Sequence, residues 1–190
     1  MKIGIWGDSI TFGSCDTEAL GWAGRIRKTL PTDDSSHLYN FGICGETSED
    51  LLERFDIEAK AIGPDKIVFA IGINDSKFPN ESDINKIPPA KFEQNLNELL
   101  QQAKNYTDQI TLVGLTKVDD ERRSVRGSRF LNEEIEKYDF IIKKVASEHR
   151  YRFISVIDVV NPVTDLADGL HPNASGYQKM FEKIKSEVGF

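Results

Sequence analysis

Short apolar runs alternate with amphipathic segments along the whole chain, and this alternation is the feature that most restricts its fold. The apolar runs predict strands at 2–6, 37–41, 66–71, 109–115 and 152–157. The amphipathic segments predict helices at 19–30, 48–62, 89–106, 129–149 and 174–187. Strands that alternate with helices in this way are typical of an α/β protein with a parallel sheet.

Two of the predicted strands contain KIVFA (66–70) and ITLVGL (110–115), which are apolar without a strict two-residue alternation. Strands of this kind are buried on both faces, so helices must cover both sides of the sheet. We therefore expect a three-layer α/β/α sandwich. Because the 190 residues contain no internal repeat and no biased tract, we expect a single domain over residues 1–190.

The charge of the chain narrows the class of partner. A formal net charge of −7 gives nucleic acids and anionic membranes no electrostatic reason to bind, so we expect a small-molecule substrate. No window approaches eighteen apolar residues, and no apolar stretch with a cleavage site follows Met1. We predict no transmembrane segment and a cytoplasmic location, unless an export signal was removed before Met1. The sequence does not indicate an oligomeric state.

Four strand ends carry residues suited to chemistry. In open α/β sheets, ligands bind beyond the carboxyl ends of the strands. The segments at these ends are GDS (7–9), FGICGETS (41–48), GIND (72–75) and, beyond the fifth strand, DGLHP (168–172). Each segment alone is also compatible with ordinary turn or helix-capping chemistry. Their shared position at one edge of the sheet favours a functional site.

The first and last of these segments could supply a nucleophile and its base. A Ser9 hydroxyl in a strand-to-helix turn is exposed near the positive end of the following helix. His171 could accept its proton and return it to the leaving alcohol, with Asp168 orienting the ring. The other histidines, His37 and His149, occupy positions at a strand start and a helix end that suggest structural roles.

The middle segments could stabilise an oxyanion, which needs donors already in place. Gly45 can bring its backbone N–H close to a ligand, and Asn74 offers a side-chain amide. The backbone N–H of Ser9 would be a third donor. Gly72 is expected to leave room for substrate beside the amide, and Thr47 has the spacing of a helix N-cap with Asp50.

Together, GDSIT, the second glycine of GICGETS, GIND and DGLH resemble the four motifs of the SGNH hydrolases, also called GDSL esterases or lipases, in the family's order. The resemblance implies a flavodoxin-like five-stranded sheet of order 2-1-3-4-5 and neither metal nor cofactor. It also implies an ester substrate, with Ser9, Asp168 and His171 as the triad. Ser9, Gly45 and Asn74 would then form the oxyanion hole. Ile10 stands where the family name has leucine, a conservative apolar exchange.

The motifs do not identify the ester. Two long connections, 76–88 and 116–128, should border the site and shape the substrate pocket. The second connection and the residue that follows it carry Arg122, Arg123, Arg126 and Arg129. Neutralisation by the neighbouring acidic residues 119–121 is favoured over recognition of an anionic substrate group.

The two cysteines, Cys15 and Cys44, are too few for a disulfide framework and are expected to be reduced thiols. We expect the Cys44 side chain to point away from the site, because the backbone of Gly45 must face the oxyanion.

Several functions fit the motifs. The sequence favours a serine esterase for short acyl esters such as acetyl esters, because no long apolar lid could shelter a fatty chain. A carbohydrate O-deacetylase, a lysophospholipase or a thioesterase could use the same residues, and a non-catalytic binding module could keep the fold. A phosphoacceptor regulator is disfavoured, although Asp75 and Thr116 would suit it, because no paired acidic cluster follows the first strand and no lysine follows FISVI (153–157).

Overall fold

The computed structural model describes residues 1–33, 35–79, 82–122 and 127–188. Its five strands form one parallel sheet in the order β2-β1-β3-β4-β5, as the resemblance implied. The strands are β1 (Lys2–Gly7), β2 (His37–Gly42), β3 (Lys66–Ala70), β4 (Ile110–Val113) and β5 (Arg152–Ile154). The order reverses direction between β1 and β3, which is where open α/β sheets form their ligand-binding crevice.

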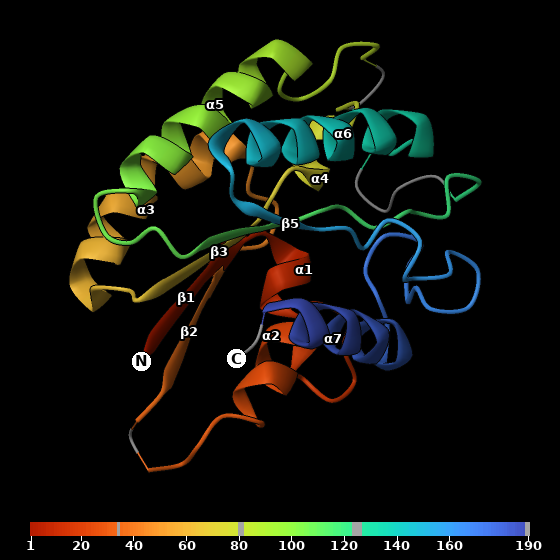
Figure 1. Cartoon of the computed structure of the whole chain (residues 1–190). Coiled ribbons are helices and arrows are strands. Elements are labelled where there is room, and N and C mark those ends of the chain that lie inside the picture. Colours follow the sequence, from red (N-terminus) through yellow and green to blue (C-terminus); the bar gives the residue numbers. More distant parts are fainter. Residues whose placement is uncertain (34, 80–81, 123–126, 189–190) are drawn as a thin grey trace.

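Helices cover both faces of the sheet, which confirms the three-layer sandwich (Figure 1). One face carries α3 (Ser48–Ile62), α5 (Pro89–Ala103) and α6 (Asn132–His149), and α4 (Ile73–Ser76) follows β3 on this side. The other face carries α1 (Ser9–Phe12), α2 (Gly21–Arg27) and α7 (Ala174–Val188). Central strand residues such as Ile3, Ile5 and Ile67 are fully buried between these layers.

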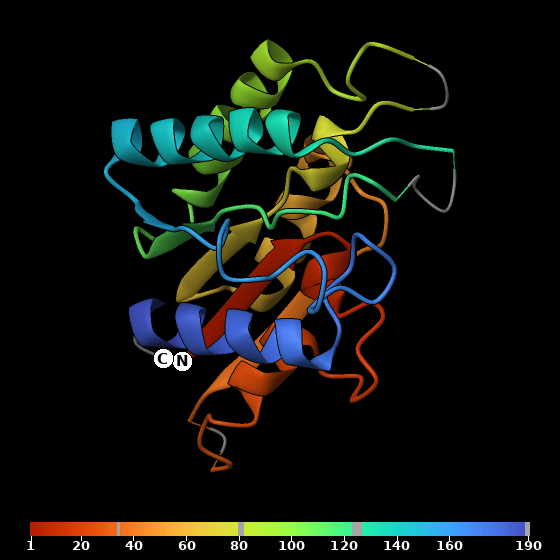
Figure 2. The ribbon, with the colours of Figure 1, turned by 90° about the vertical axis from the view of Figure 1, so that its right-hand side faces the viewer.

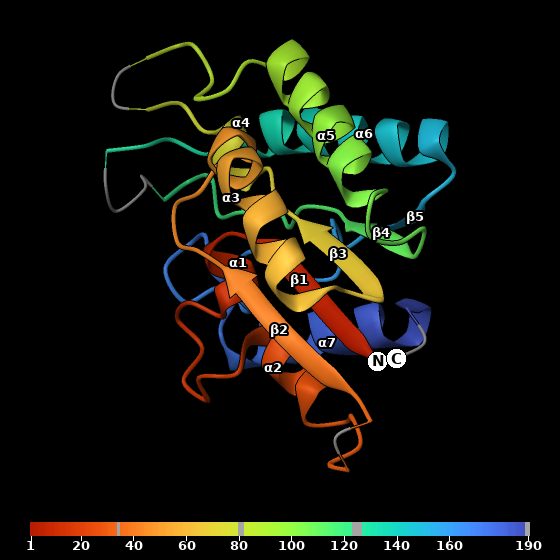
Figure 3. The same ribbon diagram turned by 90° about the vertical axis from the view of Figure 1, so that its left-hand side faces the viewer.

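The connections that follow the strands gather at one end of the sheet, with both chain termini at the opposite end (Figure 2). Seen from the other side, the arrowheads of β2 and β3 point toward the same loops (Figure 3). Among the helices of the described residues, none is both long and apolar enough to cross a bilayer.

Several predicted boundaries are wrong. Helices α2 and α5 and strand β5 each end three residues earlier than predicted, at Arg27, Ala103 and Ile154. Three further boundaries differ because a specific hydrogen bond replaces the regular pattern. Helix α2 begins at Gly21 rather than 19, because the Asp16 carboxylate accepts from the Gly21 N–H at 2.8 Å and Ala19 is left-handed. Helix α6 begins at Asn132 rather than 129, because Arg129 forms an antiparallel bridge with Phe78. Strand β4 stops before Leu115, whose N–H binds Asp139 Oδ1 at 2.8 Å. The single-turn helices α1 and α4 were not predicted.

Candidate active site

Ser9 is the first residue of α1, in the turn that follows β1. Asp8 caps α1, because its Oδ1 accepts a hydrogen bond of 2.9 Å from the Ile10 N–H. Asp8 is buried, and this burial raises its pKa to about 7. Helix α1 has only four residues, so Ser9 is held by a tight capped turn.

His171 and Asp168 lie in one short loop before α7. The Asp168 carboxylate accepts from the backbone N–H of His171 at 2.8 Å and from that of Leu170 at 3.0 Å. Its other oxygen, Oδ2, lies 2.8 Å from His171 Nδ1. Burial raises the pKa of Asp168, but the hydrogen bonds from His171 and Leu170 outweigh this, so the net pKa lies below its ordinary value. Asp168 is therefore an ionised acceptor that holds the ring.

The structure brings this loop to Ser9, since Ser9 Oγ lies 2.8 Å from His171 Nε2. Because the Asp168 carboxylate can only accept a hydrogen bond from His171 Nδ1, that nitrogen carries the ring proton. Nε2 is then free to accept a hydrogen bond from the serine hydroxyl. His37 and His149 lie elsewhere, at the start of β2 and the end of α6, and His149 Nε2 lies 2.7 Å from Asn97 Oδ1.

Helix α7 anchors the loop. Its N-cap is Asn173, because Oδ1 of this residue accepts from the Gly176 N–H at 3.1 Å. The Tyr177 hydroxyl donates to the Ser14 carbonyl at 2.8 Å, which ties α7 to the loop after α1. The elements that carry Ser9 and His171 are thus fixed to each other.

Asn74 lies in α4 and lines the same cleft as Ser9, with its amide fixed at both ends. Its Nδ2 donates to the Glu46 carbonyl at 3.1 Å, and its Oδ1 accepts from Lys77 Nζ at 3.1 Å. An ammonium can only face the oxygen, so this pair of contacts sets the orientation of the amide. The second Nδ2 hydrogen remains available for a ligand. Lys77 was not predicted as part of the site, although it stands three residues after Asn74.

Gly45 lies beside Asn74 in the connection from β2 to α3. Its φ of +85° is a left-handed conformation that favours glycine, and a Cβ placed there would meet nothing within 4 Å. The requirement for glycine is therefore conformational. The predicted capping box of α3 is present, with Thr47 N–H donating to Asp50 Oδ2 at 2.8 Å.

A buried polar network connects these two strand ends. The Asp75 carboxylate accepts from the Ser48 N–H at 3.0 Å, and Asn95 Nδ2 donates to Ser48 Oγ at 2.8 Å. Burial raises the pKa of Asp75 to about 6 despite these hydrogen bonds. The network fixes the start of α3 against α4 and α5.

The role expected for Gly72 is wrong. A Cβ at this position would meet Phe92 Cζ at 2.7 Å, so the glycine allows α4 to pack against the core and makes no room for substrate. Its φ of +132° also requires glycine.

Ser9, Gly45, Asn74, Asp168 and His171 all line one open cleft of about 480 Å³. Its wall also includes residues that the sequence analysis did not assign to the site, namely Phe12, Ser14, Lys77, Phe130 and Leu170. Phe12 is 59% exposed, so the cleft offers an apolar surface to a ligand.

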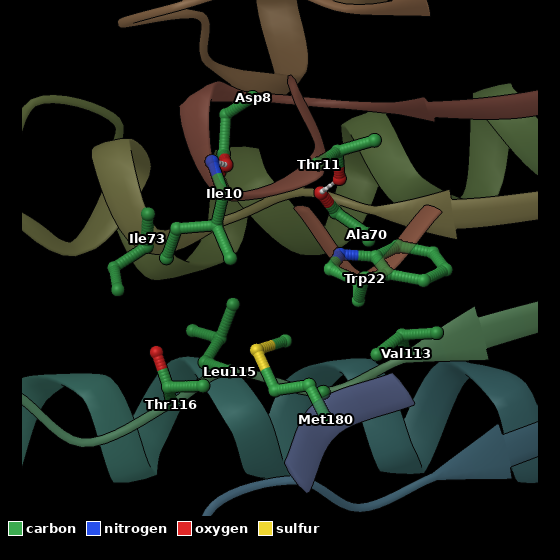
Figure 4. Close-up of a pocket in the computed structure, with 11 residues that line it drawn as sticks. Asp8, Ile10, Thr11, Trp22, Ala70, Ile73, Val113, Leu115, Thr116 and Met180 are labelled. Carbon is green, nitrogen blue, oxygen red and sulfur yellow. Dashed lines mark hydrogen bonds between the residues drawn. The ribbon is translucent and has the colours of Figure 1, made fainter. Parts of the chain in front are cut away.

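A second cavity lies beneath the Ser9 turn, where Ile10, Ile73, Leu115 and Met180 face one another (Figure 4). Its volume of about 20 Å³ is close to that of one water molecule. Substrate must therefore approach Ser9 from the open cleft.

Both cysteines line the cleft, so the expectation that Cys44 points away from it is wrong. Cys44 Sγ lies 3.2 Å from Ser14 Oγ, and Cys15 Sγ lies 3.7 Å from Asp168 Oδ2. Both residues are free thiols and both are exposed. Backbone geometry at Gly45 does not fix the direction of its neighbour's side chain.

The two long connections border the cleft, as predicted: the first contributes Lys77 and the second contributes Arg122. Arg122 Nε pairs with Asp119 at 3.0 Å, and Arg129 pairs with Asp83 at 3.1 Å. These two arginines are thus neutralised by carboxylates. Arg123 and Arg126 lie outside the described residues.

Residues 5–179 match the family model described as "GDSL-like Lipase/Acylhydrolase family". The chain belongs to this family. As a GDSL acylhydrolase it is a carboxylic ester hydrolase, and an ester is the class of substrate that the family implies.

The GDSL acylhydrolase is similar to several esterases. It is 34% identical to a multidomain esterase of Ruminococcus flavefaciens over 124 residues, a match that covers 64% of this chain and 15% of that protein. It is 22% identical to an acetylxylan esterase of Geobacillus stearothermophilus, and the match covers 100% of this chain and 97% of the relative. The first relative is therefore much longer than this chain.

Solved structures share the fold. The crystal structure of Axe2, an acetylxylan esterase from Geobacillus stearothermophilus, matches with a TM-score of 0.79 at 21% identity and covers 100% of this chain and 94% of that one. LAE5, an α/β hydrolase from the metagenome of Lake Arreo, also matches with a TM-score of 0.79, at 22% identity, covering 99% and 94% of the two chains.

Proposed function

We propose that this GDSL acylhydrolase is a serine esterase that hydrolyses short acyl esters, acetyl esters above all, through an acyl-enzyme on Ser9. The observation that carries the proposal is the continuous chain of 2.8 Å contacts from Ser9 Oγ to His171 Nε2 and from His171 Nδ1 to Asp168 Oδ2. A nucleophile, its base and the group that orients the base are connected before any substrate binds.

In this mechanism Ser9 Oγ attacks the ester carbonyl while its proton passes to His171 Nε2. The carbonyl oxygen becomes an oxyanion, which accepts hydrogen bonds from the Ser9 and Gly45 N–H groups and from Asn74 Nδ2. His171 then protonates the leaving alcohol, and the acyl group remains on Ser9. A water molecule, activated by His171, attacks this ester and releases the acid and free Ser9 Oγ.

The preference for short acyl groups rests on the shape of the cleft. Within the described part of the chain, its apolar surface near Ser9 consists of a few side chains such as Phe12, Phe130 and Leu170. The cavity beneath the Ser9 turn has the volume of about one water molecule. A fatty chain would remain largely in water.

Sugar acetates are a second candidate substrate class, supported by the relatives. Both the relative from Geobacillus stearothermophilus and the solved structure of Axe2 are described as acetylxylan esterases. Three Axe2 variants described as catalytic mutants each replace one residue: a serine, an aspartate or a histidine. The aspartate and the histidine are three residues apart in that protein, as Asp168 and His171 are here.

The test is hydrolysis of p-nitrophenyl esters from acetate to palmitate, alongside acetylated xylo-oligosaccharides. We expect acetate to have the highest kcat/KM of the p-nitrophenyl series and Ser9→Ala to abolish turnover. A fluorophosphonate should add one mass label to the native chain and none to Ser9→Ala. Preferential turnover of palmitate would contradict the short-acyl preference, and labelling of Ser9→Ala would contradict the role of Ser9.

A further inference from the structure

Cys15 lies next to the triad, in a segment whose position is fixed by its neighbours. Its Sγ is 3.7 Å from Asp168 Oδ2, the oxygen that also contacts His171 Nδ1. Asp16 is anchored by a buried ion pair with Arg25, and Ser14 by the Tyr177 hydroxyl at 2.8 Å. Because both sequence neighbours of Cys15 are anchored, its thiol is held beside the Asp168 carboxylate.

The ligating atoms of Cys15, Asp168 and His171 all lie within 4.8 Å of one another. A tetrahedral zinc ion with bonds of about 2.3 Å to sulfur and 2.0 Å to nitrogen or oxygen holds such atoms about 3.3 to 3.6 Å apart. The observed 3.7 Å between Cys15 Sγ and Asp168 Oδ2 would shorten by only about 0.2 Å. The 2.8 Å between Asp168 Oδ2 and His171 Nδ1 would lengthen by about 0.5 Å.

We propose that Cys15, Asp168 and His171 form a binding site for a borderline-soft divalent cation, zinc being the type, and that the bound cation inhibits the esterase. Thiolate, imidazole and carboxylate together favour zinc and cadmium over magnesium and calcium, which prefer oxygen ligands. The open cleft leaves a fourth coordination position for water. The effect on turnover rests on the proposed function, but the binding of the cation does not.

Inhibition follows from which nitrogen of the His171 ring carries the proton. His171 loses its Nδ1 proton to solvent and takes up one proton on Nε2, which frees the Nδ1 lone pair for the cation. The Cys15 thiol releases its proton to solvent as its sulfur becomes a ligand. The ring proton then resides on Nε2, because a neutral imidazole coordinated at one nitrogen carries its proton on the other. Nε2 can no longer accept the Ser9 proton, so kcat falls while the ester-binding surface of the cleft remains.

The first experiment measures inhibition of p-nitrophenyl acetate hydrolysis by zinc in the native chain, Cys15→Ser and Cys44→Ser. Cys44 is the matched control, because it is the other exposed thiol of the same cleft but contacts Ser14 rather than Asp168. Each protein is compared with its own metal-free rate. We expect EDTA to restore the native rate fully. Cys15→Ser should raise the inhibition constant at least about tenfold, and Cys44→Ser should change it little.

The second experiment needs no turnover. Cadmium titrated into the purified protein should produce the ultraviolet charge-transfer band of a cadmium–thiolate bond in the native chain and in Cys44→Ser, but not in Cys15→Ser. If the esterase proposal fails, this band still reports the site. Loss of the band in Cys44→Ser with retention in Cys15→Ser, or no band in the native chain, would overturn the proposal. Equal zinc inhibition of all three proteins would do so as well.

Discussion

The two sides of the cleft are held together by different kinds of contact. On the proton-transfer side (Ser9, His171 and Asp168), the base and its orienting carboxylate share one four-residue loop and reach Ser9 by a single side-chain contact of 2.8 Å. On the oxyanion side (Gly45 and Asn74), the groups come from two separate strand ends. The base and its orienting carboxylate are thus placed by one local loop, whereas Gly45 and Asn74 are brought together, and Ser9 is brought to His171, by the whole fold.

The oxyanion side depends on buried polar groups that bridge distant segments. Asp75 binds the start of α3 through Ser48, while Arg54 binds the Glu46 carboxylate and donates to the Phe41 carbonyl at 2.9 Å. Such networks are costly when one partner is missing, because a buried polar group is then left unsatisfied. We therefore expect substitutions on the proton-transfer side to remove chemistry, and those on the oxyanion side to alter both chemistry and stability.

The largest effect is expected on the proton-transfer side. Ser9→Ala should lower kcat by at least about 10⁴-fold, because it removes the covalent route. Adding His171→Ala should cost little more, since the two groups act in one proton transfer. Steady-state kinetics of both single variants and the double variant, with circular dichroism to confirm folding, measure this. Losses that multiply in the double variant would show that Ser9 and His171 act independently.

On the oxyanion side, Asn74→Ala should lower kcat by about 10² to 10³-fold with little change in KM. It deletes a donor aimed at charge that exists only in the transition state and leaves the Ser9–His171 contact intact. The readout is kcat and KM for p-nitrophenyl acetate. A large rise in KM at constant kcat, in a folded variant, would instead make Asn74 a substrate-positioning residue.

The difference between the two sides also explains what the sequence could predict. The strand-helix alternation, the capping of α3 by Thr47 and the loop of Asp168 and His171 are local patterns, and the structure shows each of them. The edge of a parallel sheet brings such local motifs together, so Ser9 and Asn74 could be placed in one cleft from their strand ends alone.

The rest depends on contacts between segments far apart in sequence. How the helices pack on the sheet decides three such contacts. They are the approach of Phe92 to Gly72, the contact of the Lys77 ammonium with Asn74, and the contact of Cys44 with Ser14. The start of α6 was misplaced for the same reason. Arg129 forms a bridge with Phe78, so the helix begins only at Asn132.

Asp8, the buried residue directly before Ser9, links stability to pH. Its pKa of about 7 is raised by burial, so the folded chain binds a proton that the unfolded chain releases near its ordinary pKa of 3.8. Stability from this group is therefore present below about pH 4 and lost as the pH rises to about 7. Asp8→Asn keeps the Ile10 cap acceptor and removes the titration.

We expect Asp8→Asn to be more stable than the native chain at pH 8 by about 1 to 2 kcal/mol, with the difference shrinking toward pH 5. For a chain of this size that is a rise of several degrees in Tm. Thermal unfolding across this pH range measures the difference, with Asp108→Asn as an exposed control. An equal difference at pH 5 and pH 8 would contradict titration as its source.

The smallest effect tests whether the oxyanion side is tuned by Lys77. In Lys77→Met the Asn74 amide keeps its contact with the Glu46 carbonyl but loses the charge that fixes its oxygen, so its orientation becomes less certain. We expect kcat to fall about threefold to tenfold, or roughly 1 kcal/mol, with KM unchanged. Lys86→Met is the matched control, because it removes a nearby exposed charge whose electrostatic effect lowers the Lys77 pKa.

The pH profile separates this role from a structural one. Burial lowers the pKa of Lys77, with Lys86 adding to the effect, so the ammonium is lost at a lower pH than for an ordinary lysine. The native kcat should then decline on the alkaline side as Lys77 becomes neutral, and Lys77→Met, already lacking the charge, should not show this decline. If both proteins decline in parallel, another group controls the alkaline limb. If kcat is unchanged in Lys77→Met at neutral pH, the Glu46 carbonyl alone suffices to orient Asn74.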